Sequence, residues 1–157
     1  MHPDISQLPS RIFYKGLLKD GPAMAEKTAR DWHVSNMFGP YRFFNILRGQ
    51  ETSGGSRSLM NKAEVQVAVS LYARLLKEFS SVDFNFRVGV VSMYRAQILE
   101  LRRAFESRFG TDITNQVDFN TVDGFQGQEK DIIILSCVRA GPGLQNVGFL
   151  SGMSKTF

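Results

Sequence analysis

The stretch of residues 121–138 limits the possible folds of this chain more than any other part of the sequence. It begins with a polar segment that holds two glycines, and it continues as an apolar run from Ile132 to Val138. An apolar run of this length, rich in β-branched residues, is typical of a strand buried on both faces of a parallel sheet. We therefore expect residues 132–138 to form a central buried strand, and Asp in place of Ile133 or Leu135 to unfold the domain.

The polar half of this stretch has the composition of a ligand-binding loop. Gly124 and Gly127 would let the backbone approach a ligand closely. A glycine-bearing loop beside a buried strand is a common ligand site at the rim of an open α/β sheet. The alternative from these residues alone is a tight loop that only turns the chain.

Composition and charge indicate a single soluble globular domain. The net charge of +4 and the pI of about 9.4 permit nucleic-acid binding, but an ordinary solvated surface has the same balance. Cys137 is the only cysteine, and His2 and His33 are isolated, so neither a disulfide framework nor a metal site is expected. No apolar segment is long enough to suggest a signal peptide or a membrane-spanning helix.

The spacing of apolar residues predicts three helices. The first is expected at residues 5–14 and ends before Gly16. The second begins at an Asn61 cap, with Glu64 in the position that completes a capping box. The third is amphipathic and is terminated by Gly110.

Strands are predicted where β-branched and aromatic residues gather. They are expected at residues 41–47, 86–91, 117–121 and 132–138. Residues 21–40 are expected to be mostly irregular, with Trp32 as a packing anchor, and residues 48–58 to form an exposed loop. From residue 41 the order is β, α, β, α, β, loop, β, which predicts an α/β fold with a mainly parallel sheet flanked by helices.

A second candidate site begins at Ser92, where a predicted strand gives way to a helix. Ligands bind at this carboxyl edge of a parallel sheet, and a helix start offers N–H groups to anions. Tyr94 can stack, Arg95 can bind a phosphate through two N–H groups, and Gln97 can read a polar edge. The alternative is an ordinary surface helix start with a solvated arginine.

Several segments of the chain resemble the senataxin-like branch of superfamily 1 (group B) helicases. Residues 122–131 are similar to motif V, and residues 92–97 to motif IV, with Met93 where the family usually has proline. In the family a Gln-Tyr-Arg triplet directly precedes Met-His-Pro, the residues with which this chain begins. Residues 146–151 are similar to the approach to motif VI.

This resemblance, which covers residues 1–151, implies the C-terminal RecA-like motor domain of an RNA/DNA helicase. It implies one incomplete domain over residues 1–157 that lacks its last elements. We expect a family-specific lead-in at residues 1–40, the sheet and crossover helices at residues 41–151, and a divergent tail at residues 152–157.

The same resemblance implies functional residues. Nucleotide contacts are expected from Tyr94, Arg95, Gln97, Gly127 and Glu129. Nucleic-acid contacts are expected from Ser92, Thr121 and Asp123, although Thr121 also fits an ordinary strand residue. No catalytic residue and no metal ligand is predicted.

Glu129 is open to other interpretations. An exposed charge at a strand entrance is the simpler one, while a nuclease site is disfavoured because Glu129 and Lys130 are adjacent rather than separated by one residue. Since strand ends on one side of a parallel sheet lie together, we expect Tyr94, Arg95, Gln97 and Glu129 to line one nucleotide-facing surface.

The parts that hydrolyse ATP are not found in this sequence. Residues 152–156 superficially resemble a phosphate-binding loop, but Ser154 and Phe149 stand where glycines are required. The Walker B carboxylate and the motif VI arginine are also missing, and Arg139 is not at the family's arginine position. We therefore expect no ATP hydrolysis by this chain alone.

The resemblance implies ATP and Mg²⁺ for the complete motor only, with neither bound by this chain alone. The implied partners are RNA and/or DNA and the missing first RecA-like domain, with no membrane, and the implied location is nuclear. The alternative function is that of a catalytically inactive, truncated fragment that acts only as a binding or interaction module.

Overall fold

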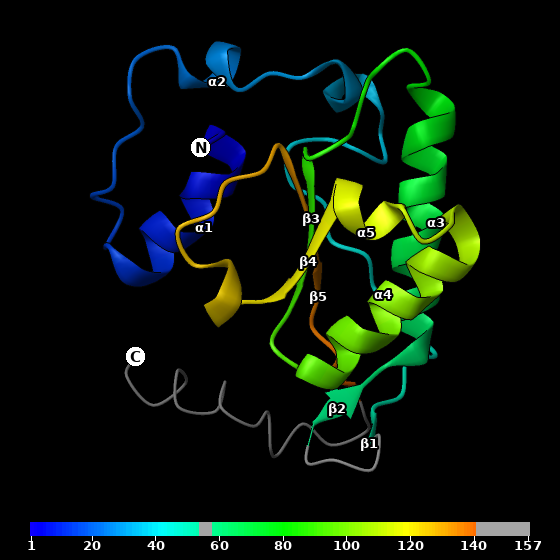
Figure 1. Ribbon diagram of the computed structural model, residues 1–157. Coiled ribbons are helices and arrows are strands. Elements are labelled where there is room, and N and C mark those ends of the chain that lie inside the picture. Colours follow the sequence, from blue (N-terminus) through cyan, green and yellow to red (C-terminus); the bar gives the residue numbers. More distant parts are fainter. Residues whose placement is uncertain (54–57, 141–157) are drawn as a thin grey trace. The chain divides into compact units, whose positions relative to one another are not determined.

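The computed structural model describes residues 1–53 and 58–140, which divide into two compact units (Figure 1). The first unit is Met1–Asn45, and the second begins at Ile46. The predicted approach to motif VI at residues 146–151 and the tail at residues 152–157 lie outside the described residues. The prediction of one incomplete domain with a lead-in stays a prediction.

The first unit is built around helix α1, Pro3–Phe13. Pro3 suits a first helical position because its missing N–H would have no partner there, and His2 Nδ1 caps the helix by accepting from the Asp4 N–H at 3.2 Å. The helix ends at Tyr14, and Gly16 has a φ of +74°, so the predicted helix and its glycine terminator are confirmed.

The rest of the first unit is mostly irregular, as expected. It contains a one-turn helix α2, Met24–Lys27, and a short 3₁₀ helix η1, Asp31–Val34. Trp32 is only 4% exposed, which confirms it as a packing anchor.

The strand predicted at residues 41–47 is wrong. These residues form no strand, and Phe43 and Leu47 are 77% and 88% exposed. Aromatic and β-branched residues favour a strand only where a neighbouring strand and a buried face are available. Within the expected loop at residues 48–58, the short strand β1, Thr52–Ser53, pairs antiparallel with β2, Leu59–Met60, which follows the loop.

The second unit holds a three-stranded sheet with parallel pairing throughout. Its strands are β3, Val88–Ser92, β4, Val117–Thr121, and β5, Ile132–Ser136, in the spatial order β4-β3-β5. Helices α3, Lys62–Glu78, and α4, Arg95–Phe109, flank this sheet (Figure 1), followed by the short α5, Ile113–Gln116. The predicted α/β fold with a parallel sheet flanked by helices is confirmed, and this architecture is RecA-like.

The core lies between the sheet and helices α3 and α4. Phe105 of α4 is fully buried, with its ring 5.4 Å from that of Tyr72 on α3 and 5.1 Å from that of Phe119 on β4. Val88 and Val90 of β3 are also fully buried. This aromatic and aliphatic packing holds α3 and α4 against the sheet.

The prediction that residues 132–138 form the central, doubly buried strand is wrong. The central strand is β3, while β5 has a neighbour on one side only among the described residues. Ile133 and Leu135 on β5 are 46% and 55% exposed. An apolar run identifies a strand, but its place in the sheet depends on the topology of the whole chain.

Candidate nucleotide and nucleic-acid sites

The carboxyl edge of the sheet carries a row of hydroxyl groups. Ser92 at the end of β3 is in register with Thr121 of β4 on one side and with Ser136 of β5 on the other. Ser92 and Ser136 are buried, and Thr121 is half-buried. The predicted nucleic-acid contact of the Ser92 side chain is therefore not supported, because this hydroxyl is fully buried and accepts from the Tyr94 N–H at 3.3 Å.

Tyr94 and Arg95 stand at this edge, at the start of α4. Tyr94 is half-buried and extended, which directs the chain from β3 into the helix. Arg95 is exposed, and no described residue bonds its guanidinium group. The helix N–H of Ala96 is occupied, because the Ser58 hydroxyl accepts from it at 3.0 Å.

The loop after β4 starts at the same edge. The Val122 N–H donates to the Ser92 carbonyl at 3.1 Å, and the Gly124 N–H donates to the Thr121 hydroxyl at 3.3 Å. Asp123 opens the short 3₁₀ helix η2, Asp123–Phe125, and is exposed. The structure thus brings Thr121 and Asp123 to the edge that carries Tyr94 and Arg95.

Gln97 does not face a ligand. Its side chain is fully buried. Its Oε1 accepts from the Asn61 N–H at 2.8 Å, and its Nε2 donates to the Asn61 carbonyl at 3.1 Å and to the Ser136 hydroxyl at 2.8 Å. The expected nucleotide contact from Gln97 is therefore not supported by this geometry, because two positions past Arg95, within the first turn of α4, the side chain points into the core.

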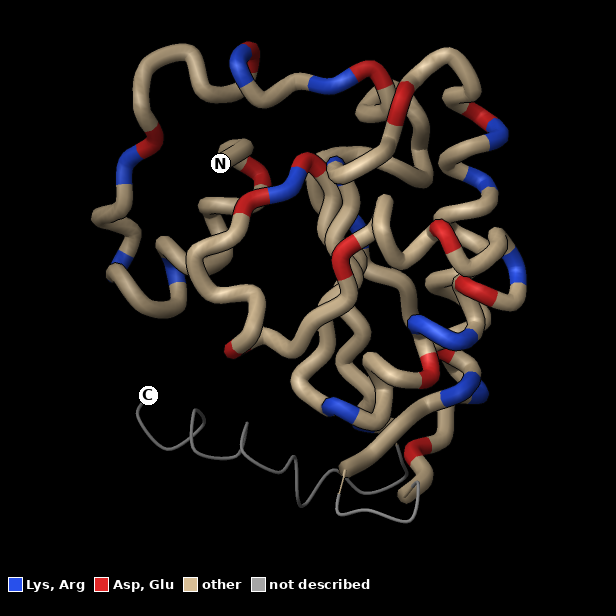
Figure 2. Tube along the Cα trace, in the orientation of Figure 1, with Lys and Arg blue, Asp and Glu red and all other residues tan. Residues whose placement is uncertain are grey.

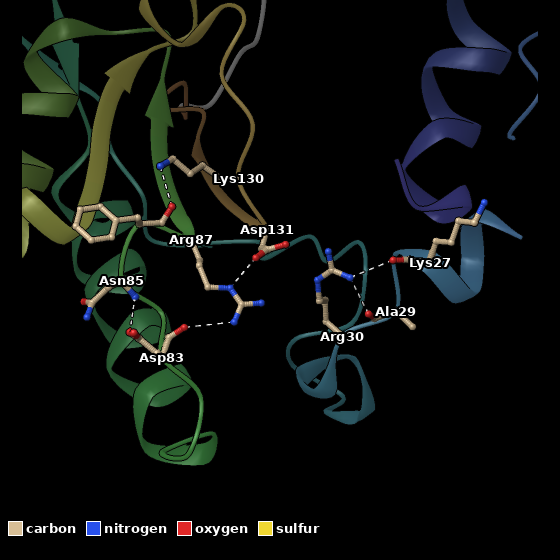
Figure 3. Close-up of polar contacts among 9 residues, drawn as sticks. Lys27, Ala29, Arg30, Asp83, Asn85, Arg87, Lys130 and Asp131 are labelled. Atoms are coloured by element: carbon tan, nitrogen blue, oxygen red, sulfur yellow. Dashed lines mark hydrogen bonds and ion pairs between the residues drawn. The ribbon is translucent and has the colours of Figure 1, made fainter.

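Glu129 lies toward the opposite edge of the sheet. The loop crosses the sheet face, where Phe125 packs so closely on Gly89 that a Cβ there would lie 2.9 Å from the ring. In Figure 1 this loop runs from the lower end of β4 to the upper end of β5. Close to Glu129, the Lys130 Nζ donates to the Phe86 carbonyl at 2.8 Å, just before β3 begins (Figure 3).

The expectation of a single nucleotide-facing surface is consequently wrong. Ile132, the first residue of β5, pairs with Val88, the first of β3, whereas Arg95 follows the last residue of β3. A five-residue strand separates its two ends by about 13 Å. The loop that follows β4 is also the loop that precedes β5, and Glu129 stands at its far end.

Ion pairs fix that far end of the loop. Arg87 Nε lies 2.6 Å from Asp131 Oδ2, and Lys130 pairs with Asp118 (Figure 3 shows the first). Gly127 has a φ of +81°, a conformation that glycine adopts readily, and Gly127 and Glu129 are both exposed. Glu129 therefore stands as an accessible carboxylate beside a strand entrance that partly exposed ion pairs hold.

Neither the distribution of charge nor the cysteine thiol helps to assign the site residues. Figure 2 shows Lys and Arg interspersed with Asp and Glu along the described chain. Burial raises the pKa of the Cys137 thiol, and the nearby Glu64 carboxylate raises it further, so this thiol is not an activated nucleophile. Among the described residues, no group of three or more His, Cys, Asp or Glu could hold a metal ion.

Glu64 makes contacts beyond the capping box that its position in the sequence predicts. Asn61 caps α3 as predicted, by accepting from the Ala63 and Glu64 N–H groups at 3.2 and 3.3 Å. The Glu64 carboxylate does not return to the Asn61 N–H, as a capping box requires, but accepts from Ser136 and Val138 on β5 and just beyond it. No local pattern in the sequence distinguishes these two arrangements.

Comparison with known proteins agrees with this architecture. Residues 1–156 match the family described as "AAA domain". The chain is 46% identical over 152 residues to "Helicase SEN1" of Saccharomyces cerevisiae and 47% identical over 150 residues to "Helicase sen1" of Schizosaccharomyces pombe. Both matches cover 96% of this chain, but only 7% and 9% of those two proteins.

A more distant match is the "Regulator of nonsense transcripts 1 homolog" of Neurospora crassa, 33% identical over 158 residues, which are 96% of this chain and 14% of that protein. With its parallel RecA-like sheet and these matches, the chain belongs to the senataxin-like superfamily 1 helicases and corresponds to their C-terminal motor region. In the part of the chain that the structure describes, no helix is long and apolar enough to cross a membrane.

Proposed function

We propose that this chain acts as the second RecA-like domain of an ATP-dependent helicase and that two opposite edges of its sheet face two different ligands. The carboxyl edge faces RNA or DNA, and the far end of the loop between β4 and β5 faces ATP in the complete motor. The observation that carries this proposal is the separation of Arg95 from Glu129 by the length of β3.

The side chains at the carboxyl edge suit a nucleic-acid strand. Thr121 and Asp123, which the family resemblance assigns to nucleic acid, share this edge with Tyr94 and Arg95. An exposed guanidinium group binds backbone phosphates, and a tyrosine ring stacks on bases without regard to sequence. We therefore reassign Tyr94 and Arg95 from the nucleotide to the nucleic acid.

The far end of the loop suits a sugar hydroxyl or another neutral part of a nucleotide. Glu129 offers one exposed carboxylate, and Gly127 leaves the backbone open beside it. A lone carboxylate accepts hydrogen bonds from hydroxyl groups, whereas Mg²⁺ needs several oxygen ligands. Bound ATP and Mg²⁺ would supply the phosphoryl chemistry, and Glu129 would orient the nucleotide from the far end of the loop between β4 and β5.

The test uses a chimera in which this chain replaces the aligned 152 residues of the yeast relative. Arg95→Ala should weaken nucleotide-free RNA binding. The slope of log affinity against log salt concentration should fall by about one, as expected for loss of one phosphate contact, and ATP turnover at saturating RNA should be largely retained. Glu129→Ala should leave RNA affinity unchanged and raise the KM for ATP.

Arg103→Ala is the matched control, because Arg103 lies on the same helix but pairs with Glu100 at 2.9 Å. Loss of RNA affinity in Glu129→Ala, or unchanged RNA affinity in Arg95→Ala, would contradict the assignment of the two edges. The nuclear location and the lack of ATP hydrolysis by this chain alone stay predictions. A role as a binding module only would follow if the chimera bound RNA but did not hydrolyse ATP.

A further inference from the structure

The chain leaves β5 through a strained turn centred on Val138. The φ of Val138 is +71°, and the Arg139 N–H donates to the Cys137 carbonyl at 2.8 Å. This bond closes a γ-turn with a positive central φ, which is rare and strained. A β-branched residue in this region is an outlier, and Val138 is also fully buried.

Both peptide groups of this turn are held from the start of α3. Glu64 Oε2 accepts from the Val138 N–H at 3.0 Å, and the Asn61 Nδ2 donates to the Val138 carbonyl at 3.1 Å. The Asn61 Nδ2 also donates to Glu64 Oε1 at 3.2 Å, so the two clamping side chains support one another. A strained backbone of this kind persists only where its surroundings hold it from several sides.

The same clamp is joined to the first turn of α4. The Ser136 hydroxyl donates to Glu64 Oε2 at 2.6 Å and accepts from the Gln97 Nε2 at 2.8 Å. Gln97 in turn accepts from the Asn61 N–H and donates to the Asn61 carbonyl. A connected network of this kind, with Gln97, Asn61 and Ser136 buried, is rigid, so it fixes the exit of β5 relative to Arg95, two residues before Gln97.

We propose that Glu64 is a positioning residue for the nucleic-acid-facing edge of the complete motor, because it holds the strained turn at Val138 and, through Ser136 and Gln97, fixes the exit of β5 relative to Arg95. Capping of α3 does not explain this arrangement, since the Asn61 side chain already accepts from both N–H groups that need a cap. The proposal rests on the proposed function in one respect, namely that the carboxyl edge beside this turn faces a ligand.

The first arm of the test measures the clamp in the 157-residue chain, without any activity. In Glu64→Ala, amide hydrogen exchange at Val138 should accelerate at least about tenfold, as expected for loss of a hydrogen bond to a charged acceptor. Exchange at Ala63 should not change, because Asn61 still caps the helix. Glu64→Gln keeps one acceptor oxygen, so its exchange rate at Val138 should lie between those of the parent and of Glu64→Ala.

The matched control is Glu78→Gln, because Glu78 is on the same helix and pairs with Arg74 at the surface. It should leave exchange at Val138 unchanged. Unchanged exchange at Val138 in Glu64→Ala would overturn the clamp. If Glu64→Ala does not melt cooperatively, Glu64→Gln takes its place, since it keeps the shape of the side chain but removes the charge of the acceptor, and exchange at Val138 should still accelerate.

The second arm measures RNA affinity and the KM for ATP in the same chimera with the yeast relative. Glu64→Ala should weaken nucleotide-free RNA binding about tenfold, with the KM for ATP unchanged, because loss of the clamp misplaces the groups at the nucleic-acid-facing edge and leaves the opposite edge intact. RNA affinity equal to that of the parent would overturn the positioning role. Failure of the proposed function is distinguished by Arg95→Ala, whose RNA affinity would then equal that of the parent.

Discussion

The two edges of the sheet are held in different ways. At the carboxyl edge, the buried amide of Gln97 and the buried hydroxyl of Ser136 form one network with the part-buried carboxylate of Glu64. At the amino edge, the start of β5 is held by partly exposed ion pairs such as Arg87–Asp131. Buried polar networks are costly to break, whereas ion pairs near the surface contribute little to stability. The carboxyl edge is therefore the rigid end, and the amino edge is adjustable.

The largest expected effect compares a buried side chain on the central strand β3 with an exposed side chain on β5. Val90→Asp should abolish cooperative folding of the chain, because a buried, unpaired carboxylate on the central strand costs several kcal/mol, comparable with a whole stability of roughly 5–15 kcal/mol. Leu135→Asp should cost only about 1 kcal/mol, because that side chain is 55% exposed. Urea unfolding of both variants checks this, and equal loss of stability would restore β5 as a doubly buried strand.

The next effect tests the rigid edge. Gln97→Leu should destabilise the chain by about 2–4 kcal/mol, because the Asn61 peptide loses both of its bonds to Gln97 while it remains buried. Gln66→Leu, at an exposed position of α3, is the control and should change the unfolding free energy by less than about 0.5 kcal/mol. Similar urea midpoints for the two variants would show that the network does not stabilise the fold.

The smallest effect tests the adjustable edge. Asp131→Asn keeps the shape of the side chain but removes the charge that pairs with Arg87. It should cost about 0.5 kcal/mol, and the difference should shrink as salt is added, because both side chains are partly exposed. A loss above about 2 kcal/mol in thermal unfolding at low salt would mean that the two edges are equally rigid.

Local patterns in the sequence predicted most elements of the second unit but not their arrangement. The cap at Asn61, the terminator Gly110 and the strand at residues 117–121 depend on neighbours a few positions away, and all three are confirmed. The central place of β3 depends on which strands pair, which no local period records. The same limit misplaced the strand expected at residues 41–47, whose side chains find no buried face.

The candidate site was predictable as a set of segments but not as a surface. Tyr94 and Arg95 were expected at a strand end, and they lie there. Gln97 was expected beside them, but the helical turn directs it into the core. Glu129 was assigned to the same surface because its loop follows β4, while the structure shows that the loop has crossed the sheet by Lys130. The positions of these side chains depend on burial and on loop path.

The most direct test of the two-edge account is photo-crosslinking of RNA to the chimera with the yeast relative. Benzoylphenylalanine is placed at Arg95 in one protein and at Glu129 in another, and each is irradiated with labelled single-stranded RNA without nucleotide. The account predicts strong RNA crosslinking from position 95 and background crosslinking from position 129, because β3 separates these positions by its length. Equal crosslinking from both positions, or crosslinking from position 129 alone, would contradict the central claim.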